Sequence, residues 1–164
     1  MTQQPRPPHL RMQGGTTQLI VRGEPMILLA GELHNSSAAS LGYLEPIWER
    51  LKALNLNTVI APVYWELVEP EEGRVEFELV DGLIQTARLH DLQLVLLWFG
   101  TWKNATSCYV PAWVKDDPCR FPRMQTKRGV SANAVSCMSE EACRADARAF
   151  GALMRRVREI DAEE

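Results

Sequence analysis

Polar and aromatic side chains able to hold a sugar gather directly after three apolar runs of this sequence. The first run is followed by Glu32, His34 and Asn35, the second by Trp65 and Glu66, and the third by Trp102, Lys103 and Asn104. A sugar ring has polar edges and apolar C–H faces, so its binding sites combine flat aromatic rings with a few fixed carboxylate, amide and ammonium groups. The residue types therefore predict a carbohydrate site assembled from all three segments.

Each of these residues also has a purely structural interpretation. A tryptophan can simply end an apolar strand, and a glutamate after a strand often interacts with the positive end of the next helix. Glu69, in the acidic turn at residues 69–73, has such a structural interpretation. The recurrence of the same residue types after three separate runs favours binding for the set as a whole.

The elements that must position these residues follow from the pattern of apolar positions. Residues 26–31, 57–64 and 92–99 lack polar alternation, which predicts strands covered on both faces. Residues 43–54 and 79–90 carry apolar residues at helical spacing. The strands begin about thirty residues apart, the length of a βαβ unit. The sequence therefore predicts an α/β fold with parallel strands, whose carboxyl ends form the ligand-binding edge.

The segment before the first strand is expected to differ from this α/β unit. Residues 1–15 are rich in Pro and Gln and are expected to form a mobile leader. Residues 17–21 and 26–30 flank a turn-forming segment at residues 22–25. This arrangement predicts a β-hairpin that leads into the first buried strand.

The segment after the third strand is expected to be mostly irregular. Residues 100–138 contain only a short predicted helix, at residues 111–115, and loops of this length usually have a function or lack order. Ser139 is suited to cap a final helix whose first turn is acidic. The predicted buried stripe of that helix consists of Phe150, Leu153, Met154, Val157 and Ile160.

Composition indicates an ordinary globular protein and disfavours several classes of partner. The chain has 164 residues, 46% hydrophobic and 24% charged, with a net charge of -3. The interspersed charges form no basic stripe for nucleic acid or an anionic membrane. No window is long and apolar enough for a transmembrane helix, and no signal-peptide core is visible. A start downstream of a real signal would look the same, so a periplasmic, extracellular or cytoplasmic location stays open.

The four cysteines give no indication of a metal or cofactor. Cys108, Cys119, Cys137 and Cys143 lack the paired spacing of a zinc site. Free thiols are the favoured prediction, with a disulfide among them as the alternative. No cofactor is expected.

Three strings of the sequence together resemble the amino-terminal part of β-galactosidases of glycoside hydrolase families 35 and 42. The strings are GELH at residues 31–34, WERLKALNLNTV at residues 48–59 and WELVEPEEG at residues 65–73. The likeness spans almost the whole chain. Two departures mark a divergent branch, since family 35 members commonly carry Trp-Asn in place of Trp65-Glu66 and Arg-Pro-Gly-Pro-Tyr in place of residues 98–102.

The resemblance implies a β-galactoside substrate and a (β/α)8 barrel hydrolysing terminal β-galactosides with retention through two glutamates. It implies that residues 16–164 form the first three βα units, preceded by a short hairpin, of an incomplete catalytic domain. The eight binding residues named above would line the sugar pocket, with the Gly100-to-Asn104 segment as one wall. The acid/base and the nucleophile would follow strands four and seven, so this chain is expected to lack both and to be inactive alone.

Two alternatives remain beside this interpretation. A non-catalytic sugar-binding or assembly fragment would complete its sheet with a partner, and open sheet edges predict self-association. A doubly wound nucleotide-binding protein is disfavoured because the segment after the first strand has one glycine, Gly31, instead of a phosphate-binding loop. Glu32 and Glu66, on neighbouring strands, are within reach of each other, but the resemblance assigns neither of them a catalytic role.

Overall fold

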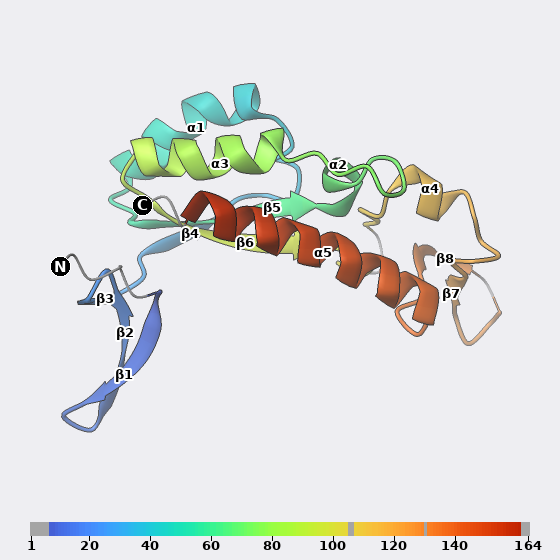
Figure 1. The fold of residues 1–164 in the computed structure, drawn as a ribbon, viewed down its shortest axis with the longest axis horizontal. Coiled ribbons are helices and arrows are strands. Elements are labelled where there is room, and N and C mark those ends of the chain that lie inside the picture. Colours follow the sequence, from blue (N-terminus) through green and yellow to red (C-terminus); the bar gives the residue numbers. More distant parts are fainter. Residues whose placement is uncertain (1–6, 105–106, 130, 162–164) are drawn as a thin grey trace.

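The computed structural model describes residues 7–104, 107–129 and 131–161 as a mixed α/β chain with three separate sheets (Figure 1). The first is an antiparallel sheet of β1 (His9–Gln13), β2 (Thr16–Val21) and β3 (Glu24–Met26), which projects away from the rest of the molecule. Residues 9–13, which the sequence assigned to the leader, thus form a strand.

The predicted hairpin is present, but its turn is shorter than expected. Val21 pairs with Glu24, so only Arg22 and Gly23 lie between the strands. Both have positive φ, 52° and 88°, as a type I′ turn requires. Glu24 and Pro25, expected in the turn, instead belong to β3.

The central sheet confirms the predicted parallel pairing. It consists of β4 (Ala30–Glu32), β5 (Thr58–Tyr64) and β6 (Gln93–Phe99) in the order β4-β5-β6. All seven residues of β5 pair in parallel register with those of β6, from Thr58 with Gln93 to Tyr64 with Phe99. Within the described residues β4 and β6 each pair with β5 alone, so the sheet is open and forms no closed barrel.

The prediction of one buried strand over residues 26–31 is wrong. Met26 ends β3, Ala30 begins β4, and the link between them is exposed, with Ile27 80% accessible. The side chain of Asn57 holds this link: its Nδ2 donates to the Ile27 carbonyl at 2.8 Å and its Oδ1 accepts from the Leu29 N–H at 2.9 Å. The Asn57 amide thus pairs backbone groups that a neighbouring strand would otherwise pair, and it fixes the link between the first sheet and the second.

Helices α1 (Leu41–Ala53) and α3 (Glu78–Leu89) lie side by side over one face of the central sheet (Figure 1). Their apolar stripes and the sheet enclose the main core, which includes Leu44, Trp48, Val59, Ala61, Leu83 and Ala87. Both helices match the predicted ranges to within two residues at each end. Asn55 has a φ of 57°, as expected for a left-handed residue after α1.

Helix α5 (Glu140–Asp161) is capped as predicted, since Ser139 Oγ accepts from the Ala142 N–H at 3.2 Å. Its predicted apolar stripe is only partly right. Leu153 is buried, but Phe150 and Met154 are 42% and 44% exposed, and the buried positions toward its start are Ala142, Ala145 and Ala149. Small alanines allow the helix to approach the neighbouring segments closely, which periodicity of large residues does not reveal.

The segment after β6 contains more structure than expected. In addition to the predicted short helix, here α4 (Ala112–Lys115), it forms a hairpin of β7 (Arg123–Gln125) and β8 (Ser131–Val135). With α2 (Trp65–Val68) and the start of α5, these elements enclose a second apolar cluster that includes Trp65, Val110, Val114, Phe121, Val135 and Ala142. The chain therefore has two cores, one under the regular helices and one built largely from loops.

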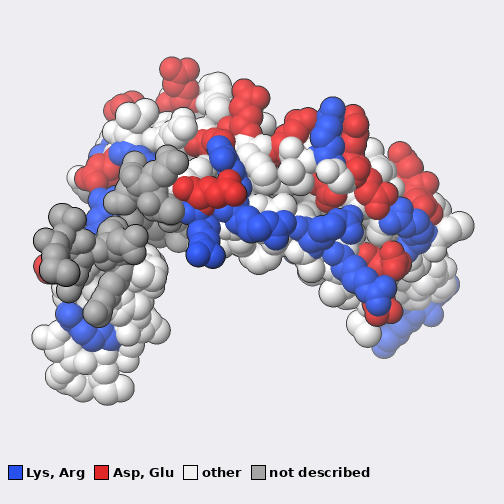
Figure 2. Space-filling view, viewed as in Figure 1, with Lys and Arg blue, Asp and Glu red and all other residues white. Residues whose placement is uncertain are grey.

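Arginines of α5 join it to its neighbours through ion pairs. Figure 2 shows Lys and Arg atoms as a line across the face over α5, bordered by acidic atoms. Arg156 donates to both carboxylate oxygens of Asp81 on α3, at 2.9 and 2.5 Å, and Arg148 lies 3.7 Å from Glu69 after α2. Arg148 and Arg156 thus join α5 to the end of α2 and to α3.

Among the described helices, none is long and apolar enough to cross a bilayer. All four cysteines are free thiols, as the sequence favoured.

Candidate functional site

The two faces of the central sheet have different environments, and Glu32 lies on the face away from the helices. Side chains alternate along a strand, and paired residues in register point to the same side. A Cβ added to Gly31 would meet side chains of Leu51 and Leu56, so Gly31 faces α1 and its neighbour Glu32 faces the other way. Glu32 pairs with Ile60, and Ile60 pairs with Val95.

The carboxyl end of this second face is covered by three aromatic rings. Tyr64 and Phe99, the last residues of β5 and β6, pair in register with ring centroids 5.7 Å apart. Tyr109 packs on both, at 5.5 Å from Tyr64 and 4.9 Å from Phe99. Lys103 Nζ lies 4.5 Å from the centre of the Phe99 ring, a cation–π distance. An aromatic floor with an ammonium group above it thus follows the ends of the two strands.

Tyr64 is held in a single, uncharged state at this floor. Its hydroxyl accepts a hydrogen bond from the Ala38 N–H at 3.2 Å, which ties the loop after β4 to the end of β5. Burial raises the pKa of Tyr64 to about 12, with smaller contributions from neighbouring Tyr109 and Glu66. At neutral pH the phenol is therefore available as a hydrogen-bond donor.

Glu66 forms an ion pair beside this aromatic floor. Its carboxylate lies 2.8 Å from Lys115 Nζ of α4, and both side chains are about one-third exposed. The Glu66 N–H donates to the Tyr109 carbonyl at 3.0 Å, which fixes the backbone next to the rings. The pair presents a negative and a positive group to solvent at a defined place, as recognition of a polar ligand requires.

The remaining predicted residues after the first strand, His34 and Asn35, lie in the loop that Ala38 ties to Tyr64. His34 is exposed and its carbonyl accepts from the Ser37 N–H at 2.8 Å, while Asn35 is half-buried. After β6, Asn104 Oδ1 accepts from the Ser107 N–H at 2.7 Å and so shapes its own loop.

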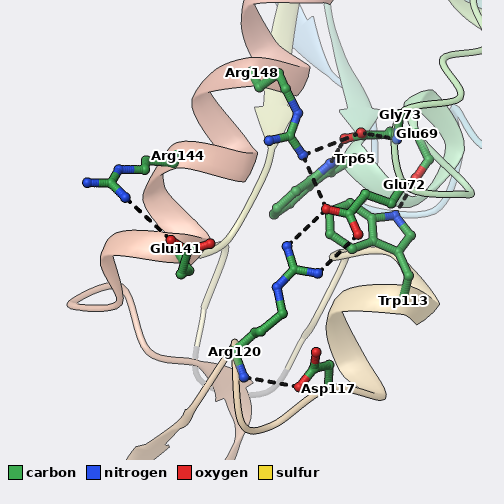
Figure 3. Close-up of polar contacts among 10 residues, drawn as sticks. All are labelled: Trp65, Glu69, Glu72, Gly73, Trp113, Asp117, Arg120, Glu141, Arg144 and Arg148. Atoms are coloured by element: carbon green, nitrogen blue, oxygen red, sulfur yellow. Dashed lines mark hydrogen bonds and ion pairs between the residues drawn. The ribbon is translucent and has the colours of Figure 1, made fainter.

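Trp65 does not face solvent in this structure. It is fully buried in the second cluster, its Nε1 donates to Glu69 Oε2 at 3.0 Å, and its ring meets Trp113 edge-on at 5.8 Å. Glu69, itself only 2% exposed, also accepts from the Gly73 N–H at 2.8 Å (Figure 3). Trp65 and Glu69 therefore form a buried, hydrogen-bonded pair next to Glu66 in the sequence, and this pair supports the backbone that carries Glu66.

An ion-pair network closes this support from outside (Figure 3). Arg120, after α4, donates twice to Glu72 at 2.9 and 3.0 Å, and Arg148 of α5 lies 3.9 Å from the same carboxylate. The hydrogen bond from Arg120 holds the pKa of Glu72 below its usual value. Three segments that are distant in sequence are thus joined behind the candidate site.

Trp102 belongs to a different place, a hollow of about 490 Å³ between the end of β6 and α5. Trp98, which also lines it, pairs with Val63 and so lies on the helix side of the sheet. The structure therefore separates the predicted set. It places Glu66 and Lys103 beside the aromatic floor, Glu32 on the same face of the sheet at the position paired with Ile60, and Trp102 at the hollow by α5.

The sequence missed four residues that shape these two places: Tyr109, Lys115, Asp146 and Phe150. Tyr109 lies in a stretch predicted as irregular, Lys115 ends the predicted short helix, and Asp146 lies in a helix whose polar positions carried no pattern. Among the residues that the structure describes, no group of three His, Cys, Asp or Glu side chains is arranged to hold a metal ion.

Comparison with known proteins decides the family. The model of "Glycosyl hydrolases family 35" matches residues 18–127. The chain belongs to glycosyl hydrolase family 35. A β-galactosidase of Xanthomonas manihotis is 38% identical over 83 residues, which cover 49% of this chain and 14% of that enzyme.

A solved structure supports the fold of this family 35 chain. An exo-β-1,4-mannosidase, Op5Man5, from Opitutaceae bacterium strain TAV5 superimposes with a TM-score of 0.54 at 15% identity, over 80% of this chain and 22% of that one. The family 35 chain thus spans a small part of the length of both enzymes.

Proposed function

We propose that this chain supplies the first three βα units of a (β/α)8 barrel, and that residues 16–164 belong to its catalytic domain. Three parallel strands in sequential order, with helices on one side, support this proposal, as does the fold shared with a solved glycosidase. In such barrels the face away from the helices is the interior, and the carboxyl ends of the strands carry the active site.

The proposed substrate is a terminal β-galactoside, bound at the aromatic floor. The observation that carries this is the register that places Glu32, Tyr64 and Phe99 on one face, with Glu66 and Lys103 beside the rings. Tyr109, which is half-buried, would lie against the C–H face of a pyranose, with the buried Tyr64 and Phe99 packed behind it, and the carboxylates and ammonium would bond the sugar hydroxyls. Asn35, His34 and Asn104 would complete the rim, and Trp65 would act from behind through Glu69.

The proposed reaction is retaining hydrolysis, which needs two carboxyl groups about 5–5.5 Å apart across the scissile bond, one as acid/base and the other as nucleophile. The family resemblance assigns these roles to glutamates after strands four and seven. The three units here therefore bind and orient the sugar, while both catalytic glutamates lie outside these 164 residues.

The test joins these 164 residues to the remainder of a family 35 catalytic domain and measures hydrolysis of p-nitrophenyl β-D-galactopyranoside. We expect β-galactose as the first product in NMR spectra, and a rise in KM of at least tenfold in Glu32→Gln. Glu45→Gln, an exposed change on α1, is the matched control. The 164-residue chain alone is expected to be inactive, and turnover by it that disappears in Glu66→Gln would contradict the proposal.

A second candidate function, assembly through open sheet edges, rests on a separate observation. β4 and β6 pair only with β5 among the described strands, and Ile27, Leu28 and Leu29 are exposed beside β4. Unpaired edges and exposed apolar residues promote association. Sedimentation velocity of the chain is expected to show concentration-dependent association that Ile27→Lys weakens, and a monomer at all concentrations would exclude this candidate.

A further inference from the structure

We propose that the hollow between the end of β6 and α5 is a second carbohydrate site, which takes a single pyranose ring on the side of the sheet opposite to Glu32. The hollow has a volume of about 490 Å³ and is lined by residues of both elements: Trp98, Thr101, Trp102, Cys137, Asp146 and Phe150 among them.

Three aromatic side chains supply the apolar surface that a sugar ring needs. Trp98 and Phe150 pack with ring centroids 5.9 Å apart and planes tilted by 51°, which forms one wall. Trp102 lines the same hollow and remains 43% exposed. Half-exposed indole and phenyl rings facing one concavity offer stacking surfaces for the C–H face of a pyranose.

Thr101 lines the hollow and carries a buried hydroxyl. Its residue is only 9% exposed, and within the described part of the chain its Oγ1 is one of three buried side-chain polar atoms without a hydrogen-bond partner. A buried polar atom without a partner is unfavourable, and a threonine hydroxyl both donates and accepts. When the Thr101 side chain rotates toward the hollow, a sugar hydroxyl there would satisfy both capacities.

Asp146 holds these groups in place before any ligand arrives. Its carboxylate accepts from Trp98 Nε1 at 2.7 Å and from the Thr101 N–H at 2.6 Å. Its oxygens retain free lone pairs, so the carboxylate can also accept from a sugar hydroxyl. A Cβ at Gly100 would lie 2.4 and 2.5 Å from the two oxygens, so only glycine allows this approach. The site is therefore preorganised by a contact between β6 and α5.

This site is distinct from the aromatic floor because the sheet lies between them. Trp98 faces α5, whereas its neighbour Phe99 faces Tyr64 and Tyr109 on the other side. The inference does not depend on the proposed galactosidase function, since it rests on residues that the floor does not use.

Cysteines provide the readout. Cys137 and Cys143 are free, exposed and line the hollow, whereas Cys119 is free and exposed but does not line it. The experiment treats the folded 164-residue chain with iodoacetamide and follows the alkylation of each thiol by mass spectrometry, with and without methyl β-D-galactopyranoside. Methyl β-D-mannopyranoside is the second probe.

We expect at least one pyranoside to slow alkylation of Cys137 or Cys143 several-fold and saturably, with Cys119 unchanged. Thr101→Val and Trp102→Ala should abolish the protection, while Tyr43→Ala, an exposed aromatic on α1, should preserve it. Circular dichroism verifies that each variant is folded. Glu32→Gln should leave the protection intact, which separates this site from the proposed substrate site.

Two results would overturn the inference. One is unchanged alkylation of Cys137 and Cys143 by both sugars up to their solubility limits. The other is protection that also covers Cys119, or that disappears in Glu32→Gln, because either would show that the hollow is not an independent site.

Discussion

The two cores of this protein are built on different principles. The main core, under α1 and α3, is formed chiefly by apolar side chains of regular elements such as Trp48 and Leu83, and it also contains the Tyr64 hydroxyl, which accepts from the Ala38 N–H. The second core, around Trp65 and Phe121, joins α2, α4, β8 and the start of α5, and encloses the carboxylate of Glu69 at its edge. Helices and strands pair their own backbone N–H and C=O groups, so the side chains between them can be mostly apolar. Loops leave such groups unpaired, and a buried polar side chain then fixes the loop geometry.

The difference matters for the candidate site because the two cores support different parts of it. The main core positions the strand ends that carry Glu32, Tyr64 and Phe99, and the second core supports Glu66 and Lys115. Four changes, from the largest expected effect to the smallest, test whether the two cores are separable.

Trp48→Ala is expected to lower the free energy of unfolding by about 3–5 kcal/mol, because it empties a large site in the main core. Urea denaturation followed by far-ultraviolet circular dichroism measures this. Tyr43→Ala, on the exposed face of the same helix, should change stability by less than about 0.5 kcal/mol. A loss below about 1 kcal/mol for Trp48→Ala would contradict the assignment of this core as the main one.

Glu69→Gln is expected to cost about 2–3 kcal/mol in the second core. The amide retains the volume but cannot accept from both Trp65 Nε1 and the Gly73 N–H, since one side of it is a donor. Near-ultraviolet circular dichroism should lose its tryptophan bands at lower urea than the far-ultraviolet signal. Glu71→Gln, an exposed change in the same turn, is the control, and coincident transitions in Glu69→Gln would show that the cores are one unit.

Alkaline pH is expected to destabilise the main core through Tyr64. Its pKa is raised from 10.0 to about 12 by burial, so its contribution is fully present below pH 10 and is lost as the pH rises toward 12. Two pKa units correspond to about 2–3 kcal/mol. Urea midpoints measured across this range should fall in the wild type and flatten in Tyr64→Phe. Equal slopes in both proteins would show that Tyr64 is not the group responsible.

Glu72→Gln is expected to have the smallest effect, a few tenths of a kcal/mol, because Glu72 and Arg120 are both more than two-fifths exposed. Since the pKa of Glu72 is lowered by Arg120, this contribution is present above the ordinary carboxyl pKa and is lost as the pH falls. Added salt should reduce the difference between variant and wild type. A loss comparable to that of Glu69→Gln would mean that the outer ion pairs, and not the buried carboxylate, hold the second core.

Sequence reasoning succeeded where a local period decides the structure. Trp48 and Leu83 each belong to a row of apolar residues at helical spacing, so both helices were predictable. Residues 58–64 and 93–99 are each an unbroken or nearly unbroken apolar run, so these two strands were predictable as well. It failed at residues 26–31, where Asn57 bonds the backbone of Ile27 and Leu29 from a distant part of the chain. No local pattern encodes such a contact.

The candidate site shows the same division. Glu32, Glu66 and Lys103 were predicted as binding residues because their types recur after apolar runs, and this stays a prediction, whereas Trp65 is buried and Trp102 lies at the separate hollow by α5. Alternation along β6 sends Trp98 and Phe99 to opposite faces, so residues adjacent in sequence serve different places.

By itself the sequence determined the α/β class, the parallel strands and the family, because these depend on apolar periodicity and on strings of adjacent residues. The tertiary structure alone decided that Tyr109 packs on Phe99, that Lys115 pairs with Glu66, that Asp146 bonds Trp98 and Thr101, and that Glu69 is buried beside Trp65. These outcomes depend on which loops meet after the strands have paired, and that is set by packing and hydrogen bonds between segments far apart in the chain.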